Sequence, residues 1–273
     1  MHDTTSISTH RVSTSHGTLH AQCWRPATTS APVSDIPILL LHDSLGCTTL
    51  WRDFPARLAE QTGHPVIAYD RLGFGQSDAR DDRLALDFIA NEAELFFPLL
   101  QAYFGFERCI VMGHSVGGGM AVHCAARHPG SCAALITESA QAFVEDRTRN
   151  GIVLAREQFS QPDAIQRLAR YHGDKARWVV DAWTETWLAP GFADWSLTTV
   201  LPQVSCPTLV IHGAEDEYGT NRHPEQIAAG INAHTELRIL PGIRHVPHRE
   251  QAMSVVLTID KFINQHSQLS MKG

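Results

Sequence analysis

The sequence predicts an α/β fold with a mostly parallel central sheet, helices on both faces and a helical cap insertion. Two observations support this class. Short apolar runs alternate with helical segments up to residue 139 and again from residue 204, which is typical of βαβ units. Between these parts, residues 140–203 contain helical segments but no convincing strand. We therefore expect a core formed by residues 1–139 and 204–273, and a helical cap formed by residues 140–203.

The individual elements follow from the spacing of apolar residues. Residues 10–26 alternate loosely about His16 and Gly17, which indicates an antiparallel hairpin, and residues 27–35 are a predicted polar loop. Uninterrupted apolar runs predict buried strands, and apolar residues at helical spacing predict helices. The predicted strands are residues 36–41, 66–69, 109–112, 132–137, 207–212 and 237–240, and the predicted helices are residues 51–61, 84–103, a stretch that ends before Pro129, 224–230 and 249–265.

Composition and charge narrow the class of protein. With 43% hydrophobic and 19% charged residues, the chain of 273 residues matches soluble globular proteins. Its net charge of −7 argues against nucleic acid or an anionic membrane as a main partner. The first residues lack the apolar segment of a signal peptide, and no apolar run approaches the length of a membrane span. Six scattered cysteines without a C-x-x-C pattern fit reduced thiols, so we expect a cytoplasmic protein.

The most informative stretch is Gly113-His114-Ser115-Val116-Gly117. It follows an apolar run and precedes a helix rich in small residues, so Ser115 stands at a turn between a strand and a helix. Such a turn strains the serine backbone, and the flanking glycines remove side chains that would clash. The hydroxyl group is then held at the carboxyl end of the sheet, in front of a helix N-terminus. The alternative is a glycine-rich turn in which Ser115 only caps the helix.

A serine nucleophile needs a general base and an acid that orients the base. Two loops that follow later strands offer these groups. Asp216 comes after the apolar run that ends at Ile211, and His245 comes after the run that ends at Leu240. Both therefore fall at the carboxyl ends of predicted parallel strands, where open α/β sheets bind their ligands.

Four motifs resemble those of the α/β-hydrolase family, and the resemblance covers nearly the whole chain. They are LLLHDSLG at 39–46, GHSVGG at 113–118, HGAEDEYG at 212–219 and RHVPHRE at 244–250. The resemblance implies the α/β-hydrolase fold and a catalytic triad in the chain order Ser115, Asp216 and His245. Family members that displace halide or open epoxides carry Asp at the position of Ser115. The serine therefore implies acyl transfer to water through an acyl-enzyme.

Other residues compete for the two supporting roles. His248, three residues after His245, is the alternative base and falls near the start of the predicted last helix. In the family, the catalytic histidine usually comes directly after the strand-end turn, which favours His245, and the spacing from His212-Gly213 favours Asp216. Three glutamates are alternative acids, two that flank Asp216 and one that ends the strand before the cap: Glu215, Glu217 and Glu138.

The oxyanion hole of this family uses two backbone N–H groups. Val116, next after the nucleophile, is expected to give one, and Ser44, with Leu45 as the alternative, is expected to give the other. The family usually has His-Gly in the loop before this second donor, whereas this chain has His42-Asp43. Because glycine tolerates backbone angles that aspartate does not, the departure leaves the conformation of this loop open.

The expected function is a serine hydrolase that cleaves carboxylic esters with a small or medium acyl group. The segment Asp43-Ser44-Leu45-Gly46, followed by Trp51, resembles the Asn-Ser-Leu-Gly segment of 3-oxoadipate enol-lactonases, so an enol-lactonase is the alternative. Carbon–carbon bond hydrolases of ring-cleavage products share the triad and come third. A non-catalytic ligand receptor on the same fold is the minor alternative, because fold alone does not determine function.

The cap carries four of the six tryptophans, between residues 178 and 195. Trp183 and Trp187 are four residues apart and should share a helix face. They either pack the cap onto the core or form an aromatic wall for an apolar group of a small-molecule substrate. We expect no cofactor, and no metal either, because no set of His, Cys and carboxylate residues has the spacing of metal ligands.

Overall fold

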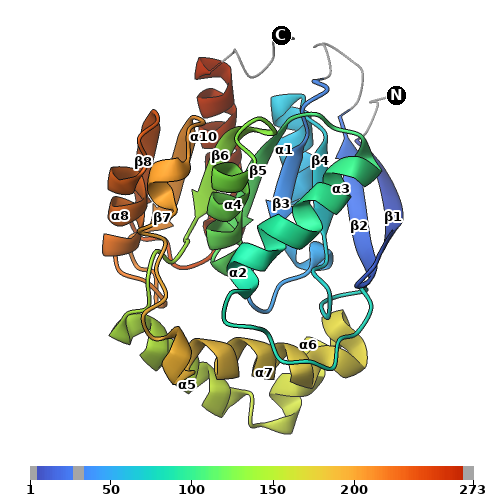
Figure 1. Cartoon of the computed structure of the whole chain (residues 1–273), viewed down its shortest axis with the longest axis vertical. Coiled ribbons are helices and arrows are strands. Elements are labelled where there is room, and N and C mark those ends of the chain that lie inside the picture. Colours follow the sequence, from blue (N-terminus) through green and yellow to red (C-terminus); the bar gives the residue numbers. More distant parts are fainter. Residues whose placement is uncertain (1–4, 27–33, 267–273) are drawn as a thin grey trace.

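The computed structural model describes residues 5–26 and 34–266, which contain an eight-stranded sheet (Figure 1). The strand order is β1-β2-β4-β3-β5-β6-β7-β8. The hairpin of β1 and β2 is antiparallel and joins β4 in antiparallel pairing, whereas all other neighbours are parallel, so the predicted fold class is confirmed. The strands are β1 (Ser6–Thr14), β2 (Gly17–Arg25), β3 (Ile38–Leu41), β4 (Val66–Tyr69), β5 (Cys109–His114), β6 (Cys132–Glu138), β7 (Thr208–Gly213) and β8 (Thr235–Leu240).

Helices cover both faces of the sheet. On one face α1 (Phe54–Thr62) packs against α10 (Ala252–Gln265). The opposite face is covered by α2 (Phe88–Asn91), the π-helical turn η2 (Glu92–Phe96), α3 (Phe97–Phe104), α4 (Val116–Arg127) and α8 (Arg222–Gly230). The predicted polar loop at 27–35 lies largely outside the described residues.

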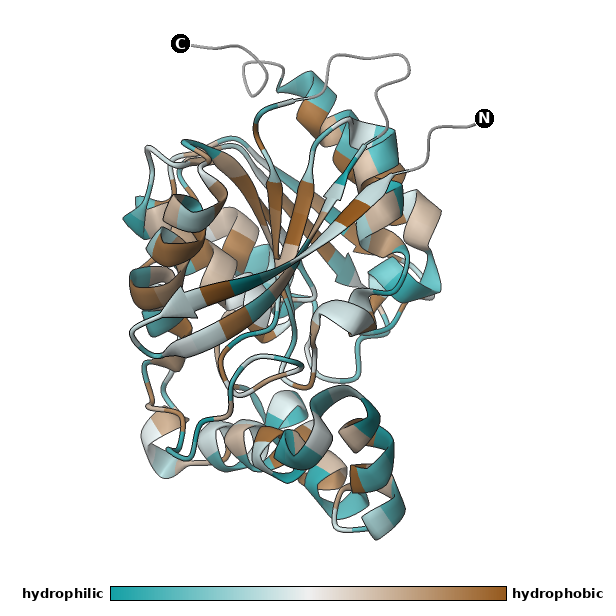
Figure 2. Ribbon diagram, turned by 90° about the vertical axis from the view of Figure 1, so that its right-hand side faces the viewer, coloured by the Kyte–Doolittle hydropathy of each residue, from teal (hydrophilic) through white to brown (hydrophobic). Residues whose placement is uncertain are grey.

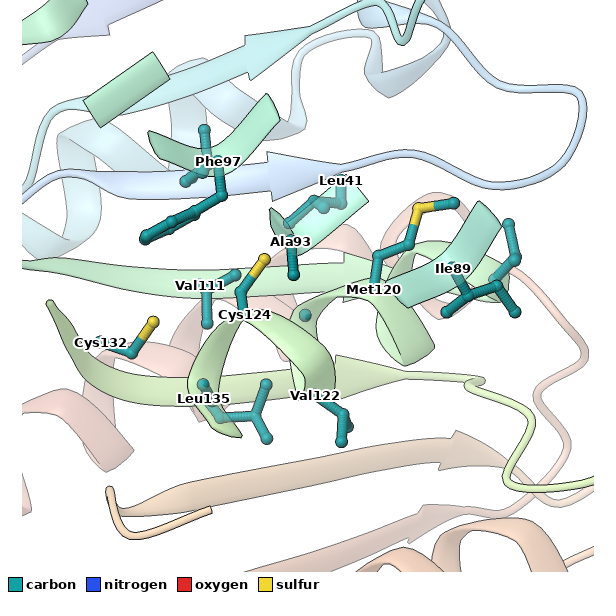
Figure 3. Packing of buried hydrophobic residues seen from close by; sticks show 14 of the residues in the cluster. Leu41, Ile89, Ala93, Phe97, Val111, Met120, Val122, Cys124, Cys132 and Leu135 are labelled. Atoms are coloured by element: carbon teal, nitrogen blue, oxygen red, sulfur yellow. The ribbon is translucent and has the colours of Figure 1, made fainter. Parts of the chain in front are cut away.

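The two faces enclose two separate apolar clusters. Val111 of β5 belongs to the cluster under α4, whereas its neighbour Met112 belongs to the cluster under α1 and α10, because successive strand residues point to opposite faces. Figure 3 shows Val111 together with Met120 and Cys124 of α4 in the first cluster. Figure 2 shows the hydrophobic residues concentrated along the strands. Burial on both faces explains why the central strands are continuous apolar runs.

Three predicted helices are interrupted or begin later than expected. The helix expected at 84–103 begins at Phe88 and passes through η2, because Pro98 lacks the N–H group that would bond to the carbonyl of Glu94 in a regular α-helix. The last helix is split into α9 (Pro247–Glu250) and α10, since Gln251, with φ −140° and ψ 55°, leaves the helical region. The helix expected at 51–61 is a 3₁₀ turn, η1 (Thr48–Trp51), followed by α1.

The segment between β6 and β7 is helical. Its elements are α5 (Asp146–Gln158), α6 (Pro162–His172), η3 (Gly173–Lys175), α7 (Ala176–Trp187), η4 (Pro190–Phe192) and η5 (Leu201–Gln203). Helices α5, α6 and α7 lie beyond the carboxyl ends of the parallel strands, at the bottom of Figure 1. Phe143 and Ser196 form an isolated antiparallel bridge at the base of this segment. The boundaries at residues 140 and 203 stay a prediction.

One histidine of the inserted segment joins it to two loops of the core. His172, at the end of α6, is buried. Its Nδ1 accepts the N–H of Gly75 at 2.8 Å, so its Nε2 carries the proton and donates to the carbonyl of Leu45 at 3.0 Å. The inserted segment is therefore hydrogen-bonded to the loop after β3 as well as to the loop after β4.

All six cysteines are buried and free, so none forms a disulfide. Burial raises the pKa of Cys47 and Cys206 to about 12, which keeps these thiols protonated. Within the described part of the chain, no helix has both the length and the apolar character needed to cross a membrane.

Candidate active site

Ser115 occupies a strained turn between β5 and α4. Its φ of 55° and ψ of −125° lie outside the helical and extended regions, as the motif predicts. A Cβ atom on Gly113 would overlap the carbonyl group of Gly117, and a Cβ atom on Gly117 would overlap the carbonyl oxygen of Leu41. Glycine is therefore required at both flanking positions, because the backbone of the turn packs directly against itself and against β3.

His245 and Asp216 meet at the carboxyl ends of β8 and β7. Their side chains are joined by the Nδ1 atom of His245 and the Oδ2 atom of Asp216 at 2.8 Å. The other oxygen of Asp216 accepts the backbone N–H groups of Tyr218 at 2.7 Å and Gly219 at 3.2 Å. Since a carboxylate only accepts, Nδ1 of His245 carries the proton and Nε2 is the basic nitrogen. No hydrogen-bond partner of that Nε2 occurs among residues 5–26 and 34–266.

The charge on Asp216 is stabilised by its neighbours. Burial alone would raise the pKa of Asp216, but His245 and the backbone N–H groups hold it below its usual range. The Nε2 atom of His212 lies 3.6 Å from the same carboxylate, and burial lowers the pKa of His212 to about 4. Near neutral pH, Asp216 is therefore an anion beside a neutral His212.

Ser115 and His245 line one cavity of about 160 Å³ between the sheet and the inserted helices. Both predicted tryptophans, Trp183 and Trp187, line it as well, and so does Glu217. The remaining lining residues come from the loop after β3, from α5 and from the ends of β6, β7 and β8: Asp43, Ser44, Leu45, Thr148, Ile152, Gln141, Tyr218 and Val246. The fold thus brings the predicted nucleophile and base to a single concave site.

The expected oxyanion donors lie at the same site. Val116 is the first residue of α4, and Ser44 and Leu45 line the cavity. Across the described residues, none of these three backbone N–H groups has a hydrogen-bond acceptor in the protein. They are therefore available to a ligand oxygen near Ser115.

Asp43 is accommodated without left-handed backbone. Its φ is not positive, so the loop does not need the glycine that is usual in the family. The carbonyl oxygen of Asp43 accepts Nδ1 of His42 at 2.8 Å and Nη2 of Arg71 at 2.9 Å, which fixes the loop. The carboxylate lies 3.6 Å from Nδ1 of His114, measured from Oδ2.

The alternative base, His248, lies in a second buried pair. Its Nδ1 contacts Oε2 of Glu138 at 2.6 Å, and its backbone N–H donates to Oε1 of the same residue at 2.7 Å. Neither residue lines the cavity that contains Ser115. Of the other alternative acids, Glu215 is exposed, and Glu217 accepts the backbone N–H of His245 at 3.3 Å rather than its ring. Geometry therefore favours Asp216 as the partner of His245.

Folding also assembles a group that its spacing in the sequence did not suggest. One donor atom each of His114, Glu138 and His248 lies within 4.8 Å of the others, a grouping that could hold a metal ion. However, Glu138 and His248 are bonded to each other, and Nε2 of His114 contacts the carbonyl oxygen of His245 at 2.8 Å. A cation would have to replace these hydrogen bonds.

Two of the cavity residues that the sequence analysis did not single out contact the predicted nucleophile or base. The hydroxyl group of Ser115 donates to Oε1 of Gln141 at 3.4 Å, and the ring centroid of Tyr218 lies 4.9 Å from that of His245. Tyr218 falls within the HGAEDEYG motif and could have been considered, whereas nothing in the local sequence indicates Gln141.

The two tryptophans differ in their surroundings. Trp187 is buried and packs edge-on against Phe192 and Trp195, with ring centroids at 5.1 and 5.6 Å. Trp183 is partly exposed, and its ring lies 6.0 Å from that of Tyr218. Trp187 thus serves packing as well as the cavity, whereas Trp183 faces the cavity from a less confined position.

Comparisons with known proteins agree with this architecture. Serine hydrolase BPHL from Mus musculus is 24% identical over 243 residues, which cover 83% of this chain and 78% of that protein. A non-heme haloperoxidase from Rhodococcus erythropolis is 25% identical over 214 residues, 68% of this chain and 77% of that protein. The solved structure of 2-hydroxy-6-oxo-6-phenylhexa-2,4-dienoate hydrolase from Rhodococcus sp. strain RHA1 superposes with a TM-score of 0.77 at 17% identity, over 96% of this chain and all of that one.

A family model described as the alpha/beta hydrolase fold matches residues 36–184, which is more than half of the chain. This stretch begins just before β3 and runs through the turn at Ser115 into α7. The chain therefore belongs to the α/β-hydrolase family of enzymes.

Proposed function

We propose that this protein is a serine hydrolase of carboxylic esters that works through an acyl-enzyme. One observation carries the proposal. Ser115 and His245 line the same cavity, while Asp216 holds the other ring nitrogen of His245 at 2.8 Å from outside the cavity. This is the arrangement that serine–histidine–acid catalysis needs.

In the proposed reaction, Ser115 Oγ attacks the ester carbonyl carbon, and Nε2 of His245 takes the hydroxyl proton. The carbonyl π electrons move to the oxygen, and the N–H groups of Val116 and Ser44, with Leu45 as the alternative, stabilise this oxyanion. Collapse of the intermediate expels the alcohol, which receives the proton from His245. Water then attacks the acyl-enzyme with His245 as base, and release of the acid restores Ser115.

The cavity supports a small or medium acyl group. Its volume of about 160 Å³ lies below the roughly 300–1,000 Å³ of most small-molecule sites, and the two tryptophans, Ile152 and Leu45 give it apolar walls. Among the residues that line it, Asp43 and Glu217 are acidic and none is Lys or Arg. The lining therefore offers no Lys or Arg to an anionic substrate group, and Glu217 would repel one, so the cavity favours neutral esters.

The alternatives use the same three residues. An enol-lactonase is favoured by the Asp43-Ser44-Leu45-Gly46 segment, and a carbon–carbon bond hydrolase by the overall similarity to the dienoate hydrolase. The substrates of both classes carry carboxylate groups, which a cavity lining without Lys or Arg does not stabilise. We therefore rank both below the ester hydrolase.

Labelling with a fluorophosphonate probe tests the proposal. The wild-type protein should take up the label and Ser115→Ala should not. Ser44→Ala, which changes another serine of the cavity, should still be labelled. Without the probe, the wild-type protein should cleave neutral short-chain p-nitrophenyl esters faster than enol-lactones or dienone ring-cleavage products. A folded wild-type protein that neither takes up the probe nor cleaves any of these compounds would instead indicate the ligand receptor.

A further inference from the structure

We propose that His114 is a positioning residue for this reaction. It joins Asp43 in the loop after β3, which carries the expected donors Ser44 and Leu45 and is called the oxyanion loop below, to the loop that carries His245. The inference rests on the proposed serine-hydrolase function and extends it to a residue outside the triad. His114 is the last residue of β5 and directly precedes Ser115. It is therefore covalently linked to the nucleophile and also contacts Asp43 and the backbone of His245.

The contacts of His114 define its role. The ring is buried, and its Nε2 lies 2.8 Å from the backbone carbonyl oxygen of His245. Since a carbonyl oxygen only accepts, Nε2 carries a proton. The other ring nitrogen, Nδ1, faces Oδ2 of Asp43 at 3.6 Å. A doubly protonated ring satisfies both neighbours at once, with an ion pair on one side and a hydrogen bond on the other.

The surroundings of His114 support this charge. Asp43 from the loop after β3 and Glu138 from β6 are the anions that act on the ring; His248 of α9, His245 and the uncharged Trp51 are its other neighbours. Burial alone would lower the pKa of His114, but Asp43 and Glu138 together raise it above its usual value.

The neighbouring histidine does not compete for the proton. Burial lowers the pKa of His248, so His248 stays neutral. Burial alone would raise the pKa of Glu138, but His248 and His114 hold it below its usual value, so Glu138 stays ionised. Arg249 is a further cation that acts on Asp43. His114 is thus the imidazolium of the cluster.

The pairing of His114 with Asp43 compensates for the aspartate at position 43, where the family usually has glycine. Asp43 stands directly before the expected oxyanion donors, where an unpaired carboxylate would oppose the negative charge that develops on the substrate oxygen. A unit charge within about 6 Å at an effective dielectric constant of about 20 changes a rate by roughly 100-fold. His114 neutralises Asp43 and at the same time fixes the backbone of the base.

The first test compares kcat and KM for a neutral p-nitrophenyl ester in the wild type and three variants. His114→Gln keeps a donor near the position of Nε2 but removes the charge, and we expect kcat to fall about 30- to 100-fold with KM changed less than about threefold. Adding Asp43→Asn to His114→Gln should recover about tenfold in kcat, because the unpaired charge is then gone. His64→Gln is the matched control. His64 is also buried, and its Nδ1 donates to the backbone carbonyl of Ile36 at 2.7 Å, but neither residue lines the cavity.

The second test is the pH profile, which does not need the His114 variant to fold. In the wild type, kcat should fall at alkaline pH as His114 loses its proton, and this alkaline decrease should be absent in Asp43→Asn. Histidine ¹⁵N NMR shifts should show one doubly protonated ring at pH 7 that is missing in His114→Gln.

The outcomes separate this inference from the proposed function. If wild-type protein takes up the fluorophosphonate probe but His114→Gln keeps full kcat, or Asp43→Asn keeps the alkaline decrease, then His114 only fills the core and the inference is wrong. If the folded wild type does not react with the probe at all, the hydrolase proposal itself fails.

Discussion

The change of Asp216 to Asn tests the site most directly. Asp216 accepts three donors, two backbone N–H groups on Oδ1 and the His245 ring on Oδ2. An Asn side chain has one accepting oxygen, and the N–H groups of Tyr218 and Gly219 hold that oxygen in the Oδ1 position. The amide NH₂ group then faces Nδ1 of His245 and donates to it. The ring proton moves to Nε2, which can no longer accept the proton of Ser115.

The expected loss in turnover is about 10⁴-fold, equivalent to about 5 kcal/mol of transition-state stabilisation. The fold should survive, because the two backbone hydrogen bonds are kept. The assay is kcat/KM for a neutral ester, with the urea midpoint of the same preparation as a check on folding.

Glu138→Gln is the matched control, since it alters a second buried histidine–carboxylate pair that does not reach the cavity. It should change kcat/KM by less than about tenfold while lowering the urea midpoint, because a buried ionic hydrogen bond is weakened. The reasoning would be refuted if Asp216→Asn retained near wild-type turnover while Glu138→Gln lost it. In that case the acid is Glu138 and the base His248.

Three further predictions concern stability and the cavity. Burial lowers the pKa of His123 to about 4, so below about pH 6.5 the unfolded chain binds a proton there that the native state does not. This residue alone should lower the free energy of unfolding by about 2 kcal/mol between pH 7 and 5. Urea titrations of His123→Leu should show a loss smaller by that amount, and an equal loss would contradict the assignment. Trp187→Ala should lower the free energy of unfolding by about 3–5 kcal/mol, because Trp187 is buried. Trp183→Ala should mainly raise KM for esters with apolar acyl groups, because Trp183 lines the cavity. The reverse pattern would contradict the different roles assigned to the two residues. Gly117→Ala places a Cβ atom against the carbonyl oxygen of Leu41, so it should yield insoluble or unfolded protein, and a soluble, fully active variant would show that the turn tolerates a side chain.

Much of the fold could be predicted because its signals are local. Strand β5 is buried on both faces, so its residues form a continuous apolar run, and the turn at Ser115 needs glycines that no other residue replaces. The contact between Asp216 and His245 was also within reach. Both follow strands whose carboxyl ends meet at one edge of a parallel sheet, so two residues 29 positions apart are brought together by topology alone.

The remainder depends on contacts that local patterns do not encode. The pair of Glu138 and His248 joins residues 110 positions apart, and the sequence presented them only as rivals of the triad. The π-helical turn before Pro98 results from a missing N–H group inside a stretch with good helical periodicity. Gln141 enters the cavity because of the path of the chain after β6, which no spacing rule predicts.

The hydrogen bonds of His172 bear on how such an enzyme could be re-engineered. Inserted helices of this kind could be exchanged between related enzymes to change substrate selectivity, on the assumption that selectivity is independent of the catalytic residues. Here one buried imidazole of the insertion holds the carbonyl of Leu45, in the peptide chain that carries an expected oxyanion donor. A chimera that replaces residues 140–203 without a histidine at this point would lose the hydrogen bond to Leu45 and leave only the bonds at Asp43 to hold this loop. Its turnover number would change together with its selectivity, so grafted insertions need to bring their own anchor for Leu45.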